Sequence, residues 1–158
     1  MAPASDPHSP SPSSEGELYA SETDAYDALC AYTLTLGDAE FLHQYVVDAW
    51  TIEHASQLTK PIALNFAMFG LYCGVEKSIS GRKVQRFHMQ MARVRREWPS
   101  LPLPQGSPSV TVLDVIKAPA GPERNDLIRK WAAATWSCCA EARPKIVELA
   151  WVECGIKP

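Results

Sequence analysis

FLHQYVVDAWTIEHA, residues 41–55, carries the pattern that decides the fold of this chain. At about 100° per residue, its large apolar side chains fall on one face of a helix. That face holds Phe41, Leu42, Tyr45, Val46, Ala49 and Ile52. Asp48 falls on the opposite, polar side, where we expect it to be solvated or to cap a helix. The spacing therefore predicts an amphipathic helix, which we extend from a cap at Asp38 to about Gln57.

Three ionisable side chains of this stretch are our candidate catalytic residues. Glu53 falls inside the apolar arc, about 120° from Phe41. His43 and His54 are eleven residues apart and share a stripe beside Trp50. Burial raises the pKa of a carboxyl group and a nearby cation lowers it, and groups shifted in this way are frequent at functional sites.

Three interpretations of these side chains stay open. In the first, Glu53 and His54 act as general acid and base on a substrate between them. In the second, one histidine binds a divalent metal together with Asp48; both cannot hold one ion, because about 16 Å of helix rise separates them. In the third, Glu53 pairs with a buried arginine or a backbone donor, and each histidine caps a neighbouring element.

The rest of the chain also has helical spacing, interrupted by breakers. Ser21 begins a first helix, Pro61 suits the first turn of a third helix, and Ser80 caps a fourth that extends to Trp98. A last helix starts near Asn125 and is kinked or split at Pro144. We therefore predict an all-α fold, a single bundle-like domain of five or six helices over residues 21–154.

Two segments are expected not to be helical. Residues 1–20 are rich in proline and serine, and we interpret them as a disordered tail. Residues 110–116 are β-branched but have no partner strand, so we expect a short extended segment packed on the helices.

Composition excludes several classes of protein. The longest apolar helix, which begins at Pro61, is too short to span a bilayer once its glycines and Glu76 are counted. The five cysteines form no CxxC pair and no zinc spacing, and no secretory signal precedes them, which indicates reduced thiols in a cytoplasmic protein with no bound metal. Nucleotide-binding, hydrolase and kinase signatures are missing from the sequence.

Charge is segregated along the chain. Residues 1–59 contain ten acidic side chains and no lysine or arginine, whereas residues 77–98 contain seven basic side chains and one acidic. We interpret the basic helix as an exposed face that complements acidic helices of the same domain, and we expect no nucleic-acid partner. A non-enzymatic module that binds a ligand or a protein through this helix remains the alternative.

The stretch resembles a family of small helical proteins of unknown function that is common in actinobacteria. The family pattern is His-Gln, then Val-Asp-Ala-Tyr, then Gln-His-Pro, and here it is His43-Gln44, Val47-Asp48-Ala49-Trp50 and Glu53-His54-Ala55. Weaker similarity extends over roughly residues 19–150. It includes residues 110–115 and the segment from Trp131 to Trp136.

The departures from that pattern shape the functional hypothesis. The chain lacks the family's Cys-Pro-x-Cys segment, and it has Asn65 where the family has histidine and Glu53 where the family has glutamine. If the family binds a metal through those positions, the resemblance implies that this member has lost it. A carboxylate gained beside a retained histidine suggests acid–base work instead.

We therefore predict a small cofactor-free enzyme of specialised, natural-product metabolism that uses acid–base catalysis in an aromatic-lined pocket. Its substrate would be a small, aromatic molecule, and a condensation or cyclisation of the Pictet–Spengler type on an aromatic amine is one reaction that fits. Asn65, Trp50 and Tyr72 are the candidate substrate-binding residues. No membrane partner is expected, and a homodimer is left open.

Overall fold

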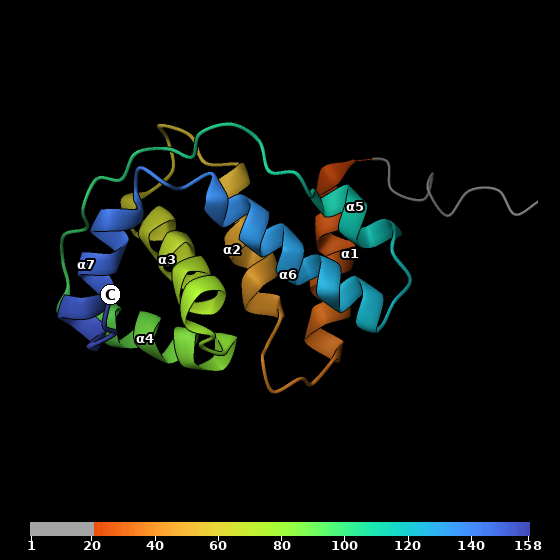
Figure 1. Ribbon diagram of the computed structural model, residues 1–158, viewed down its shortest axis with the longest axis horizontal. Coiled ribbons are helices and arrows are strands. Elements are labelled where there is room, and N and C mark those ends of the chain that lie inside the picture. The colour runs from red at the N-terminus through yellow and green to blue at the C-terminus, as the bar shows by residue number, and fades with distance from the viewer. Residues whose placement is uncertain (1–20) are drawn as a thin grey trace, which may run out of the picture.

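The computed structural model describes residues 21–158, which contain seven α-helices, one π-helical segment and no strand (Figure 1). In chain order these are α1 (Glu22–Thr35), α2 (His43–Glu53), α3 (Pro61–Leu71), η2 (Tyr72–Glu76), α4 (Gly81–Val94), α5 (Val112–Lys117), α6 (Pro122–Ser137) and α7 (Arg143–Cys154). The predicted all-α fold is confirmed. The tail predicted for residues 1–20 lies outside the described residues. None of the described helices is long and apolar enough to cross a bilayer.

Two helices connect the two ends of the molecule. α2 and α6 lie in the middle, with α1 and α5 at one end and α3, α4 and α7 at the other (Figure 1). Each of the two contributes to two buried apolar clusters, one around α1 and α5 and one around α3, η2, α4 and α7. Ile52 of α2 belongs to the second cluster, and Val46, six residues earlier, belongs to the first. The two ends of α2 therefore pack into different cores.

The helix ends follow the breakers in the sequence. Ser21 and Ser80 are N-caps whose side chains accept backbone N–H groups of Asp24 and Lys83. Pro61 lies in the first turn of α3, as predicted. Pro144 lies in the first turn of α7, so that it separates two helices and does not kink one. The missing N–H of proline costs nothing at that position, because the first-turn N–H groups have no helical acceptor.

The extended segment predicted over residues 110–116 is wrong, because Val112–Lys117 is the helix α5. Thr111 and Asp114 form a capping box: each side chain accepts the backbone N–H of the other residue. This local cap and the burial of Val112, Val115 and Ile116 outweigh the β-propensity of the segment. The connection before it, residues 95–111, runs along the molecule without regular structure from the end of α4 to α5, as its prolines predict (Figure 1).

The prediction for Asp48 is also wrong, because its side chain is only 3% exposed and faces α3. Gln44 donates to Asp48 Oδ1 over 2.9 Å, and Gly70 provides the room for Oδ2. α2 is shorter than predicted: Phe41 has a φ of 58° and precedes the helix, while Asp38 accepts the N–H of Leu42. α4 likewise ends at Val94, before Trp98.

Candidate functional site

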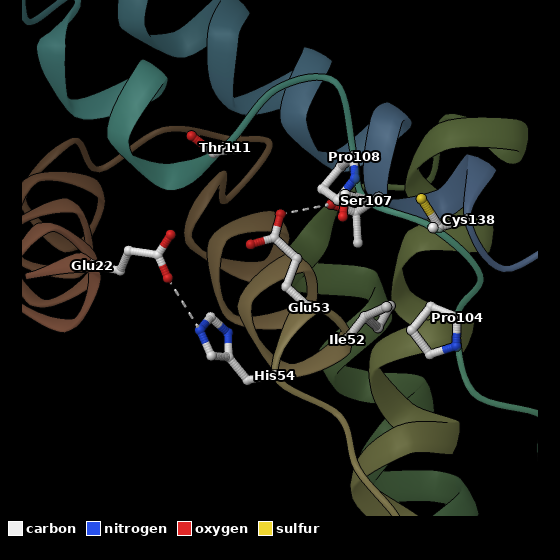
Figure 2. A pocket seen from close by; sticks show the side chains of 11 residues that line it. Glu22, Ile52, Glu53, His54, Pro104, Ser107, Pro108, Thr111 and Cys138 are labelled. Carbon is white, nitrogen blue, oxygen red and sulfur yellow. Dashed lines mark hydrogen bonds and ion pairs between the residues drawn. The ribbon is translucent and has the colours of Figure 1, made fainter.

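A pocket of about 230 Å³ lies at the C-terminal end of α2. Its walls come from the start of α1, the end of α2, the last turn of α6 and the proline-rich connection, as Figure 2 shows. The lining residues are Glu22, Ile52, Glu53, His54, Pro104, Gly106, Ser107, Pro108, Thr111, Thr135 and Cys138. Two of the three candidate catalytic residues, Glu53 and His54, are therefore brought together in one pocket.

The carboxylate of Glu53 is held on one side only. The indole N–H of Trp131 donates to Glu53 Oε1, and the hydroxyl of Thr135 donates to the same oxygen over 3.4 Å. Trp131 and Thr135 are four residues apart, so both project from the same face of α6. Oε2 accepts no hydrogen bond from residues 21–158, and it points toward the side on which Glu22 and His54 lie (Figure 2).

The environment of Glu53 favours its protonated form. Partial burial raises the pKa of this carboxyl above its ordinary value near 4.5. The hydrogen bond from Trp131, the charge of His54 and the hydrogen bond from Thr135 each pull the pKa down, and desolvation outweighs them. A carboxylic acid with a raised pKa at the wall of a pocket is placed to give up a proton and to take one back.

The imidazole of His54 is oriented by the backbone carbonyl and the indole ring of Trp50. Its Nδ1 lies 3.0 Å from the carbonyl oxygen of Trp50, so this nitrogen carries the hydrogen and donates. Its ring lies 3.7 Å from the ring of Trp50, which in turn stacks at 4.4 Å on Tyr26 of α1. Nε2 is left facing Glu22, with Oε2 of that residue 3.7 Å away.

The proline-rich connection closes one wall of the pocket. The backbone N–H of Gln105 donates to the carbonyl oxygen of Cys138 over 2.8 Å, which ties the connection to the end of α6. Pro104, Gly106, Ser107 and Pro108 then pass over the pocket. This wall presents prolines and hydroxyl groups, not the aromatic rings expected from the composition.

His43, the third candidate catalytic residue, lies far from the other two. It is the first residue of α2, while Glu53 is the last, so about 15 Å of helix rise separates them. Its Nδ1 lies 2.9 Å from Oγ1 of Thr33, whose hydroxyl donates in turn to the carbonyl of Leu29. Burial lowers the pKa of His43, which keeps the ring neutral in this packing position.

The candidate substrate-binding residues are not among those that line the pocket. Trp50 contacts His54 through its backbone carbonyl and its indole ring. Tyr72 is fully buried in the core and its hydroxyl has no partner among the described residues. Asn65 is also fully buried, and its amide donates to the carbonyl oxygens of Pro61 and Pro99 over 2.9 and 2.8 Å. It thereby ties the proline-rich connection to α3.

The metal alternative has no ligand set within the described part of the chain. No group of three or more His, Cys, Asp or Glu side chains in residues 21–158 is placed to hold an ion. His43 and Asp48 are both on α2, but each is engaged with its own neighbour, Thr33 and Gln44 respectively.

Sequence reasoning missed Trp131, Thr135 and Glu22 as members of the site. The sequence pattern of α6 places Trp131 and Thr135 at ordinary core positions. Only their i, i+4 spacing, which puts two hydrogen-bond donors on one buried face, could have suggested that they bind a carboxylate of another helix. Glu22 lies 31 residues before Glu53 in the chain, and no local pattern connects them.

These features define a small all-α protein with a pocket, lined by two carboxylates and one imidazole, between α1, α2, α6 and the proline-rich connection. The chain belongs to a family described as "Family of unknown function (DUF5946)", whose model matches residues 23–140. The matched range includes every lining residue of the pocket except Glu22. No curated protein and no solved structure matches the chain.

Proposed function

We propose that the protein is an enzyme that uses general acid–base catalysis on a small molecule bound beside Glu53. The observation that carries this proposal is the asymmetric environment of the Glu53 carboxyl. Oε1 is fixed by Trp131 and Thr135, while Oε2 has no partner among the described residues and lies at the pocket wall. Glu76, a carboxylate outside the pocket, has both oxygens occupied, by Trp136 and Arg143.

The groups around Glu53 suggest a separate role for each residue in catalysis and in substrate binding. Glu53, with its raised pKa, gives a proton to a leaving group and then, as carboxylate, removes one. His54 presents Nε2 beside Glu22, and this pair positions the polar part of the substrate. His43, Asn65 and Tyr72 lie outside the pocket, so we assign them no contact with the substrate.

The charge of the lining favours a cationic substrate. Two carboxylates, Glu22 and Glu53, and one imidazole face the pocket, and no lysine or arginine is among the lining residues. A protonated amine would balance this charge, and it would lower the cost of ionising the half-buried Glu53. A small amine is therefore the substrate class that we propose.

Condensation of an aromatic amine with an aldehyde, followed by ring closure, is a reaction that this set of groups can support. The bound ammonium group first loses one proton to solvent, and the neutral amine nitrogen adds to the aldehyde carbon while one of its remaining protons moves to the oxygen. Protonated Glu53 then gives its proton to the resulting hydroxyl, which leaves as water. The aromatic ring then attacks the iminium carbon, and the Glu53 carboxylate takes the proton that the ring carbon releases. The net change is the loss of one water; the proton released to solvent is taken up again by the product amine, and Glu53 ends in its protonated starting form.

The test is product formation from a panel of aromatic ethylamines and small aldehydes, followed by mass spectrometry for the adduct that has lost one water. Glu53→Gln keeps an acceptor for Trp131 and Thr135 but can no longer transfer a proton. We therefore expect the rate of product formation to fall at least 100-fold, which is the low end of what general acid–base groups contribute (about 10²–10⁴-fold). Glu76→Gln, which also faces an indole donor but lies outside the pocket, is the matched control. Unchanged turnover in a folded Glu53→Gln protein would contradict the proposal.

A further inference from the structure

One face of α4 is a stripe of exposed cations with an apolar side chain among them. Arg82, Arg86, Met89 and Arg93 fall within about 60° of one another on the helix. All four are exposed, and Met89 is 58% exposed although it is a large apolar residue. α4 contains no aspartate or glutamate. We call these four residues the basic stripe.

The basic stripe is not neutralised within the described residues. No carboxylate of residues 21–158 pairs with Arg82, Arg86 or Arg93; the ion pair nearest in sequence is that of Arg95 with Glu153 on α7. Of the seven basic residues in 77–98, for which we expected complementary acidic helices of the same domain, Arg95 alone forms an ion pair within residues 21–158. Arg82 and Arg86 are four residues apart, and like charges at this spacing destabilise a helix unless something compensates them.

A matching stripe of opposite charge lies on α1. Asp24, Asp27, Ala31 and Leu34 fall within about 80° of one another, all exposed, and Leu34 is 60% exposed. α1 contains no lysine or arginine. We call these residues the acidic stripe. α1 and α4 lie at opposite ends of the molecule in Figure 1, so the two stripes cannot meet within one chain.

We infer that the acidic stripe of one copy binds the basic stripe of a second copy. Both helices have 14 residues, and each stripe places acidic or basic groups beside one exposed apolar side chain. The basic stripe borders a depression of about 390 Å³, lined by Arg86, Met89, Gln90, Arg93 and Val94. Leu34 of the second copy is the side chain that fits there, with Asp27 reaching the arginines.

We infer the heterologous arrangement, in which α1 of each copy meets α4 of the next copy and the two contacts of one copy involve different neighbours. Each copy that binds through α1 still has its own α4 free, so association continues head to tail and is not limited to a symmetric dimer. The contact is held largely by exposed charges, and it therefore weakens as salt screens them over about 10 Å at 0.1 M.

The experiment is sedimentation velocity of the full chain over a range of concentrations at low salt. We expect the average mass to rise with concentration beyond that of two chains, and to return to that of one chain in high salt. Arg86→Glu/Arg93→Glu and Asp27→Lys/Ala31→Lys should each sediment as single chains, because in each variant both stripes have the same sign. An equal mixture of the two variants should associate again, since each variant then finds its complement.

The control is Lys130→Glu/Lys157→Glu, which changes the net charge by the same amount as Arg86→Glu/Arg93→Glu but at exposed positions outside the stripes, and it should associate like the wild type. Circular dichroism of each variant confirms that it is folded. The inference is overturned if the wild-type chain keeps the mass of one chain at every concentration in low salt. It is also overturned if the mixed variants fail to associate. That result would mean that the basic stripe does not bind the acidic stripe and is left for another partner, such as an acidic peptide or a nucleic acid.

Discussion

The carboxylate of Asp48 on α2 lies directly against the backbone of Gly70 on α3. A methyl group added to Gly70 would overlap Oδ2 of Asp48 and come within 2.8 Å of its Cγ. Both residues are buried, and Oδ2 has no hydrogen-bond partner among the described residues. The close approach of α2 and α3 therefore depends on a glycine at this one position of α3, and it fixes the helix that carries Glu53.

Gly70→Ala should therefore destabilise the fold by about 1–3 kcal/mol, the usual cost of overpacking, although alanine has the higher helix propensity. Urea unfolding provides the measurement. In the double variant Asp48→Ala/Gly70→Ala the obstructing carboxylate is gone, so the cost of the alanine at position 70 should largely disappear. Equal costs with and without Asp48 would show that the two side chains do not compete for this space.

Asp48→Asn should remove part of the dependence of stability on pH. Burial raises the pKa of Asp48 well above its ordinary value of 3.8, so the folded state binds a proton that the unfolded state has released. Stability from this group is present below the unfolded pKa and is lost as pH rises toward the folded pKa. Free energies of unfolding measured across this range should fall more steeply for wild type than for Asp48→Asn. Parallel curves would contradict the raised pKa.

Thr111→Ala should cost about 0.5–2 kcal/mol, because it removes the cap of α5 and leaves Asp114 N–H without its side-chain acceptor. Thermal unfolding gives the change in stability, and amide hydrogen exchange over residues 112–117 shows whether the loss is local. Thr23→Ala, at an exposed position in α1, is a control that should change stability little. A stable Thr111→Ala protein with unchanged exchange would mean that burial of the apolar side chains alone holds this helix.

Trp131→Phe should raise the pKa of Glu53 further, because the indole N–H stabilises the ionised carboxylate and phenylalanine has no donor. The carbon-13 shift of the Glu53 carboxyl, followed against pH, reports this change. Trp136→Phe is the matched control: it removes an indole donor from Glu76 and should raise only the pKa of that carboxyl, leaving Glu53 unchanged. If Trp131→Phe leaves the pKa of Glu53 unchanged, the indole N–H does not stabilise the ionised carboxylate.

Helix content was predictable because it depends on local signals. Ser21, Ser80 and Pro61 mark helix starts through their own side chains, and the structure places them there. α5 was missed because its β-branched residues were weighted above the Thr111–Asp114 box that starts it. Asp48 was missed for another reason: the room for its carboxylate is made by Gly70 on a different helix, and periodicity within α2 carries no information about that partner.

The site was predictable only near Glu53. Its place on the inward side of α2 followed from helical spacing, and His54 follows it directly in sequence. Trp131 and Glu22 join them only through tertiary packing, across separations of 78 and 31 residues. The proline-rich connection becomes a wall of the pocket because the backbone N–H of Gln105 donates to the carbonyl oxygen of Cys138. Amino-acid composition carries no information about this contact.

The most direct test of the central claim is the titration of the Glu53 carboxyl in the folded wild-type protein, read from its side-chain carbon-13 resonance. A half-buried acid that exchanges protons at the pocket wall should titrate with a midpoint above the ordinary value near 4.5. A midpoint at or below that value in a folded protein would show a permanently ionised, structural carboxylate and would contradict the acid–base role.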